Sequence, residues 1–312
     1  MSESRRRPLK VGVQLPEAER HVPWAELAEM ARTAEGAGFD SLWVGDHLLY
    51  RDRGAEPVGP WEAWSLLAAL ATTTRRVEIG PLVACLGFHN PAMLAKKAAT
   101  VEEISGGRLV LGVGAGWNEA EFAAFGFPFD HRVDRFAEAF TIIRTLLRDG
   151  AIDFAGDYHQ ARDCVLTPRG PRPDGPPLMI GSLGPRVLGL TLPFVDSWNA
   201  WYADFGNDPA ALPPLLARVD TACRAAGRDP ATLERTVALL IGLPGARGRV
   251  SSYGTSPPLE GRPEALADVL RAVARSGVAH VQLVLDPITV DSIEALSPVL
   301  ALLDRDAREP SR

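Results

Sequence analysis

The sequence predicts a single (β/α)8 barrel, or TIM barrel, and three observations support this fold class. Eight short runs with strand character alternate along the chain with predicted helices, each run followed by a helix. No sustained hairpin pattern interrupts this alternation, which favours parallel strands joined by helical crossovers. The chain has 312 residues, a length at which α/β barrels are commonly one domain. An open doubly wound sheet is the rival architecture, but it usually needs fewer units.

The eight predicted strands are apolar or alternating runs bounded by turn residues. They cover residues 9–15, 41–44, 77–85, 109–113, 178–180, 195–198, 236–243 and 280–285. The third contains Gly80-Pro81. Because proline cannot donate to a central ladder, this pair indicates a strand start or a bulge. The fourth ends in Gly112-x-Gly114-x-Gly116, whose spacing is neither a Rossmann fingerprint nor a P-loop.

The predicted helices have apolar residues at spacings of three and four, with capping residues or proline at the start. They cover residues 23–36, 61–74, 90–106, 133–147, 209–226, 263–273 and 293–303, and a further polar helix start lies at 118–121. Gly36 and Gly38 should end the first helix. Asn90-Pro91 should open the third, and Asp291 should cap the last.

Two segments lack either periodicity. Residues 150–177 are rich in Pro, Gly and Arg and are expected to form an irregular excursion with room for a short hairpin. Residues 244–261 combine Gly, Pro and Ser/Thr and are expected to form a mobile lid. The barrel domain should therefore span residues 9–304 with insertions at its C-terminal face, between a disordered tail at 1–8 and a second tail at 305–312.

Composition narrows the class of protein. The net charge is -6, so the chain lacks the basic footprint expected of a nucleic-acid binder. No run approaches the roughly 18 apolar residues of a membrane span. Cys85, Cys164 and Cys223 cannot all pair and form no C-x-x-C motif. We therefore expect a cytoplasmic protein.

Ligands of a barrel bind where its strands end, at the C-terminal face. The chain places polar residues or glycines after most predicted strands. These candidate positions are Asp46-His47, 85–89, 114–119, 181–186, Trp198-Asn199 and Asp286.

With those strand ends placed, the chain resembles the bacterial luciferase-like superfamily. The matching segments are AEGAGFDSLWVGDHLL (34–49), EAWSLLAALATTTRRVEIG (62–80), FHNPAMLAKKAATVEEISGGRLVLGVGAGWNEAEFAAFG (88–126), PPLMIGSLGPR (176–186) and DSWN (196–199). The resemblance runs from Val11 to Leu303. It implies a barrel that binds a flavin, or the deazaflavin coenzyme F420, at its open end.

The Asp46-His47 pair is similar to the pattern of the deazaflavin-dependent branch. That resemblance implies that His47 lies beside the reactive ring and that Asp46 helps to orient it. A histidine near its ordinary pKa can give or take a proton during hydride transfer. Glu119 is the next acid-base candidate on the rim. No metal site is predicted.

The resemblance also implies the cofactor-binding positions. Leu82-Val83 matches the non-proline cis peptide that backs the ring. The remaining positions are Gly114, Ala115, Gly116 and Trp117 along the cofactor, Gly181, Ser182, Gly184 and Arg186 at its phosphate, and Trp198 and Asn199 near the ring or substrate. Backbone amides of a glycine-rich turn suit an anion.

Two departures bear on the substrate. Trp117 stands where sugar-phosphate dehydrogenases of the branch have an acidic residue, and no lysine occurs beyond Lys97. Both argue against a sugar phosphate. Aromatic residues suggest a broad aromatic-lined pocket, although barrel packing would account for about half of them. These residues are Trp61, Trp64, Phe88, Trp117, Trp198, Trp201 and Tyr202.

The sequence therefore predicts an F420-dependent oxidoreductase that transfers a hydride to or from a bulky apolar or aromatic small molecule. The alternative is a two-component FMN-dependent monooxygenase, which would use O2 and need a separate reductase as partner. A third hypothesis is a barrel that only carries a flavin. We expect a homodimer.

Overall fold

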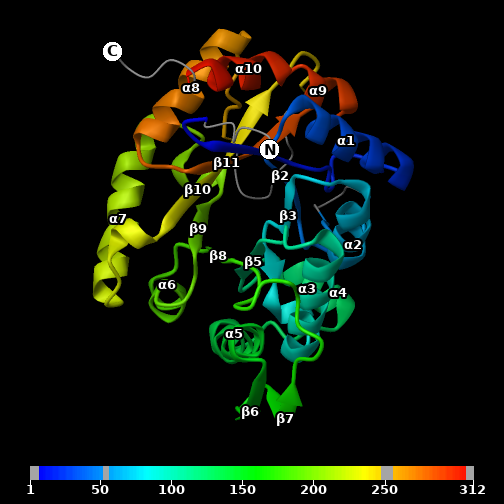
Figure 1. The fold of residues 1–312 in the computed structure, drawn as a ribbon, viewed down its shortest axis with the longest axis vertical. Helices are drawn as coiled ribbons and strands as arrows, with labels where there is room; N and C mark the ends of the chain where they lie inside the picture. The colour runs from blue at the N-terminus through cyan, green and yellow to red at the C-terminus, as the bar shows by residue number, and fades with distance from the viewer. Residues whose placement is uncertain (1–6, 52–55, 247–255, 307–312) are drawn as a thin grey trace.

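The computed structural model describes residues 7–51, 56–246 and 256–306. Nine parallel strands form one sheet in the order β3-β2-β1-β11-β10-β9-β8-β5-β4, which curls into a nearly closed barrel (Figure 1). The strands are β1 Lys10–Gln14, β2 Ser41–Val44, β3 Glu78–Pro81, β4 Ala84–Cys85, β5 Leu111–Gly114, β8 Leu178–Gly181, β9 Ser197–Ala200, β10 Glu234–Gly242 and β11 His280–Asp286. The predicted barrel is confirmed.

The third predicted strand is divided into β3 and β4 at Leu82-Val83, which form a cis peptide. This break explains why nine strands occupy the eight positions of the barrel. We call the junction of β3, β4 and β5 the seam of the barrel. There, β4 pairs with β5 over Ala84 and Cys85 only. A single bridge between Ile79 and Leu109 joins β3 to β5.

Helices surround the sheet. They are α1 Trp24–Ala37, α2 Ala63–Thr73, α3 Pro91–Ser105, α4 Glu119–Phe125, α5 Arg132–Asp149, α6 Pro185–Thr191, α7 Leu212–Ala225, α8 Pro263–Arg275, α9 Val290–Glu294 and α10 Ser297–Asp306. Asn90 caps α3 by accepting a hydrogen bond from the Met93 amide, as predicted. The first helix passes through Gly36 and ends at Gly38, whose φ of 96° suits glycine.

The last predicted helix differs from the structure. It is split into α9 and α10, and Thr289 rather than Asp291 caps α9. The Thr289 hydroxyl accepts from the Ser292 amide at 3.0 Å, because its backbone is extended and Asp291 already lies inside the first turn.

The excursion after α5 contains a hairpin, β6 Ala151–Ala155 and β7 Gln160–Val165. It projects from the lower end of the molecule beside α5 (Figure 1). Glu138 on α5 holds its turn, because its carboxylate accepts from the amides of Asp157, Tyr158 and His159.

Polar side chains line part of the barrel interior and hydrogen-bond to one another. The Asn199 amide donates to Thr236 Oγ1 and to Gln282 Oε1, both at 2.8 Å. The Trp43 indole on β2 donates to Ser41 Oγ at 2.7 Å. A Cβ on Gly12 or Gly80 would lie 2.8 Å from the Trp43 ring. Trp43 therefore packs against glycines of both neighbouring strands, β1 and β3.

In the described ranges, no helix has the length and apolar character needed to cross a bilayer. The centre of the expected lid, residues 247–255, lies outside the described residues, as do tail residues 1–6 and 307–312.

Candidate active site

His47 follows β2 at the C-terminal end of the barrel, where the sequence placed it. Its Nδ1 donates to Glu121 Oε1 at 2.9 Å. The second oxygen of Glu121 accepts from the Leu48 amide at 2.9 Å. Asn118 also bonds this loop, donating to the Leu49 carbonyl. The start of α4 and the segment after β2 are thus one hydrogen-bonded unit.

Acidic groups around His47 favour its charged form. Burial by itself lowers the pKa of His47, but the hydrogen bond to Glu121 and the charges of Glu17, Glu121 and Asp46 outweigh burial and raise this pKa above its ordinary value. Glu17 is 8% exposed. It occupies the space where Gly45 lacks a side chain, since a Cβ there would lie 1.4 Å from Glu17 Oε1.

Asp46 has hydrogen-bond partners other than His47. Its Oδ2 accepts from His89 Nε2 at 2.8 Å and from the Cys85 amide at 2.9 Å. Asp46 also acts on His47 through its charge. Burial and the Asp46 charge raise the pKa of the Cys85 thiol, so it stays protonated at neutral pH.

Two aromatic rings flank His47. The Tyr50 ring centroid lies 4.8 Å from that of His47, and Trp117 packs edge-on at 5.5 Å. Tyr50 and Trp117 are 6.5 Å apart. Trp117 therefore places an aromatic ring beside His47, at the position where the sequence departs from an acidic residue.

Glycines pack closely against Val83. A Cβ on Gly112, Gly114 or Gly181 would approach the Val83 methyl groups to 2.9, 2.8 and 3.1 Å. Gly116 has a φ of 78°, and a Cβ there would lie 2.5 Å from Cys85 Sγ. These positions therefore need glycine, because larger side chains would displace Val83 or Cys85.

The candidate phosphate turn follows β8. Ser182 Oγ accepts from the Gly184 amide at 3.1 Å, and Gly184 precedes α6. The Arg186 side chain is 62% exposed and forms an ion pair with Asp134 on α5. Gly181 and Ser182 are partly exposed, so the turn is accessible to an anion.

Trp198 and Asn199 have other surroundings than expected. The Trp198 side chain is fully buried, and its indole donates to the Ser182 carbonyl at 2.8 Å. It supports the turn from within. Asn199 belongs to the polar network inside the barrel.

Sequence reasoning selected Glu119, which is exposed on α4, and missed Glu121, which is 1% exposed. It also missed the roles of Glu17, Tyr50 and His89. A helix of seven residues gives too short a pattern to show which glutamate is buried.

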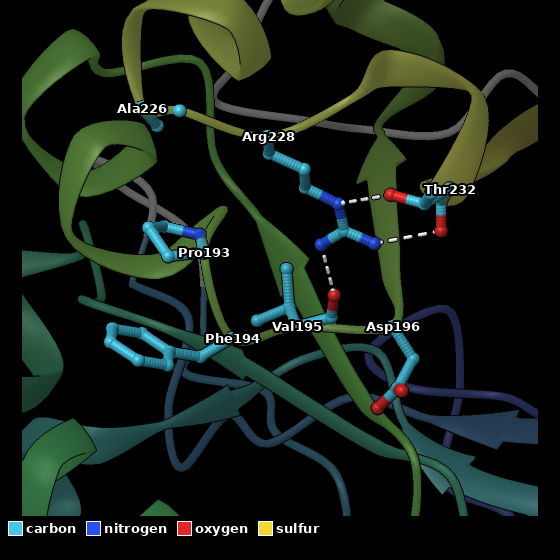
Figure 2. Close-up of a pocket in the computed structure, with 8 residues that line it drawn as sticks. Pro193, Phe194, Val195, Asp196, Ala226, Arg228 and Thr232 are labelled. Atoms are coloured by element: carbon cyan, nitrogen blue, oxygen red, sulfur yellow. Dashed lines mark hydrogen bonds between the residues drawn. The ribbon is translucent and has the colours of Figure 1, made fainter.

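A cavity of about 380 Å³ lies at the opposite end of the barrel, before β9 and β10 (Figure 2). Arg228 lies in its wall and donates to Thr232 Oγ1 at 2.9 Å and to the Thr232 and Leu192 carbonyls, both at 2.7 Å. These bonds join two loops, so Arg228 has a structural role.

A family model described as luciferase-like monooxygenase matches residues 8–242. The chain belongs to this family. The sequence-based resemblance is therefore confirmed.

Curated relatives of this luciferase-like chain include F420-dependent dehydrogenases and a monooxygenase. F420-dependent glucose-6-phosphate dehydrogenase of Amycolatopsis mediterranei is 38% identical over 57% of this chain and 53% of the relative. F420-dependent hydroxymycolic acid dehydrogenase of Mycobacterium tuberculosis is 34% identical over 68% and 58%. Pyrimidine monooxygenase RutA of Cronobacter sakazakii is 33% identical over 54% and 50%. The chain spans about half the length of these relatives.

Solved structures share the whole fold. An F420-dependent secondary alcohol dehydrogenase in complex with an F420-acetone adduct has a TM-score of 0.78 at 22% identity, covering 95% of this chain and 99% of that one. A riboflavin lyase with modified FMN has a TM-score of 0.80 at 16% identity, covering 97% and 93%. At these identities the likeness shows the fold alone.

Proposed function

We propose that this protein is a coenzyme F420-dependent oxidoreductase that transfers a hydride to or from a bulky apolar or aromatic small molecule. The observation that carries the proposal is His47, held at the barrel mouth by Glu121 and facing an environment that raises its pKa. Relatives that use F420 in the deazaflavin branch support it.

The residues present fit such a cofactor. Val83, packed on Gly112, Gly114 and Gly181, would back a tricyclic ring. The turn from Gly181 to Arg186 would hold the phosphate. Ala115, Gly116 and Trp117 would lie along the chain that joins the ring to the phosphate. Arg186 would add charge only by exchanging its present partner, Asp134. When bound, the deazaflavin supplies a ring carbon that accepts or releases a hydride.

His47 would handle the proton. With Nδ1 engaged by Glu121, Nε2 is the atom that gives a proton to the substrate or takes one from it. Because its surroundings raise the pKa of His47, they favour the protonated ring, which suits the direction in which a substrate is reduced. Asp46 acts beneath it, binding the Cys85 amide and His89. Glu119, exposed at the rim, remains a second acid-base candidate.

The aromatic walls favour an uncharged substrate. Tyr50 and Trp117 flank His47, so the groups nearest the proton donor offer flat apolar faces. Lys96 and Lys97 lie on α3, and no lysine follows them. A sugar phosphate would find no ammonium partner beyond those positions.

The second candidate is an FMN-dependent monooxygenase supplied with reduced flavin by a separate reductase. Similarity to RutA favours it, and the same residues around Val83 and the same turn would bind FMN. In either case we propose a cytoplasmic homodimer acting on a small molecule.

Titration of the purified protein with oxidised F420 and with FMN separates the two candidates. Binding is measured by absorbance and fluorescence, and we expect F420 to bind more tightly than FMN. We also expect no oxygen consumption when reduced FMN is supplied. Tighter FMN binding with oxygen uptake would instead establish the monooxygenase.

A further inference from the structure

Two histidine-carboxylate pairs meet at the barrel mouth, and they are crossed relative to the sequence. His47 pairs with Glu121, while Asp46 pairs with His89. We infer that Glu121, and not Asp46, is the positioning residue that fixes the tautomer, ring direction and charge of His47. This inference rests on the proposed function for its catalytic meaning, while the pairing itself can be measured without a cofactor.

Hydrogen bonds to both oxygens of Glu121 fix the orientation of its carboxylate. One oxygen accepts from His47 Nδ1 at 2.9 Å, and the other accepts from the Leu48 amide at 2.9 Å and the Leu49 amide at 3.4 Å. An ionised carboxylate only accepts hydrogen bonds, so Nδ1 must carry a hydrogen. Because the same carboxylate is fixed by the backbone beside His47, the ring cannot rotate without losing its hydrogen bond to Glu121. Nε2 is therefore directed away from Glu121.

The charged groups around His47 come from three elements. Glu121 belongs to α4, Asp46 follows β2, and Glu17 follows β1. Glu121 is the one that contributes a hydrogen bond as well as charge to the raised pKa of His47, whereas Glu17 and Asp46 contribute charge alone. Asp46 forms hydrogen bonds with Cys85 and His89. The titratable ring nearest to His47 is Tyr50.

A purely structural role is the competing explanation. Glu121 also ties α4 to the loop at Leu48, so its removal would disturb packing whether or not it tunes His47. The discriminating quantity is the pKa of His47 in the free protein. If Glu121 has only a structural role, its replacement should leave the pKa of His47 unchanged. If Glu121 positions and charges His47, the pKa of His47 should fall when the carboxylate charge is removed.

The experiment is an NMR titration of the histidine ring protons in the wild type and in Glu121→Gln, Asp46→Asn and Glu119→Gln, with the His47 signal assigned by its loss in His47→Phe. We expect the pKa of His47 to fall by about one unit or more in Glu121→Gln. It should fall less in Asp46→Asn and stay unchanged in Glu119→Gln, the matched control on the same helix. An unchanged pKa in Glu121→Gln, or a larger fall in Asp46→Asn, overturns the inference.

If Glu121→Gln does not fold, Glu121→Asp is titrated instead. This variant keeps the charge but draws it back by one methylene, so the pKa of His47 should still fall, and an unchanged value overturns the inference. In enzyme loaded with F420, the alkaline limb of the rate profile should move to lower pH by the same amount. If the wild type does not bind F420, the proposed function is refuted, whereas the NMR result still stands.

Discussion

His280 gives a prediction whose size follows from the structure. It is 3% exposed inside the barrel, and its Nε2 lies 2.7 Å from Ser41 Oγ, which in turn accepts from the Trp43 indole. Ser41 therefore donates its hydroxyl hydrogen to a neutral imidazole. Burial, and then the charge of Lys10, lower the pKa of His280 to about 3.

A lowered pKa means that the folded protein stays neutral at His280 while the unfolded chain takes up a proton near pH 6.5. Stability from this group is complete above pH 6.5 and is lost as the pH falls toward the folded-state value. At pH 5, about 1.5 pH units below the unfolded pKa, the loss is about 2 kcal/mol at about 1.36 kcal/mol for each unit. This figure holds for any folded-state pKa below about 4, because the folded protein then binds almost no proton at pH 5.

The assay compares the wild type with His280→Gln, which has nothing to titrate at this position. Urea unfolding at pH 7 and pH 5 gives the free energy of unfolding for both proteins. The variant should be less stable at pH 7, and the difference should shrink by about 2 kcal/mol at pH 5. Other titrating groups cancel in this comparison. Equal differences at the two pH values would refute a buried neutral His280.

Three further predictions concern the mouth of the barrel. His47→Phe should lower turnover by about 10²- to 10⁴-fold with near-normal cofactor affinity, and full turnover with normal binding would leave His47 only a packing role. Ser182→Glu should weaken cofactor binding strongly in a fluorescence titration, because its charge repels the phosphate; unchanged affinity would place the phosphate elsewhere. Gly114→Ala puts a Cβ 2.8 Å from Val83 and should reduce cofactor affinity. Gly36→Ala meets nothing within 4 Å on the surface of α1 and serves as the control, so equal effects would contradict the proposed ring wall.

Local patterns were sufficient to predict most of the fold. The alternation of buried strands with helices, and signals such as Asn90-Pro91, act over a few residues, so the sequence contains them directly. The split of the last helix depended on whether Thr289 or Asp291 would cap it, and both are good capping residues. The extended backbone of Thr289, which decides the matter, is set by the chain around it.

The pairings at the site could not be predicted in the same way. The Leu82-Val83 cis peptide was expected only through resemblance, and the structure contains it. That Glu121 reaches His47 across 74 positions depends on how α4 packs against the segment after β2. A neighbour in sequence, Asp46, was the natural choice, but the folded segment after β2 places it against His89 instead.

The seam between β3, β4 and β5 has consequences for how the barrel opens. Only two residues of β4 and one bridge of β3 join β5 there, so few ladder bonds resist local separation. Val83, with the glycines packed against it, lies on this same seam. A molecule bound beside Val83 would connect the two edges and slow amide exchange along β4 and β5. Ligand binding at this seam would then increase the cooperativity of unfolding. Without a ligand, local unfolding of the barrel would begin at the seam, which is also the proposed binding site.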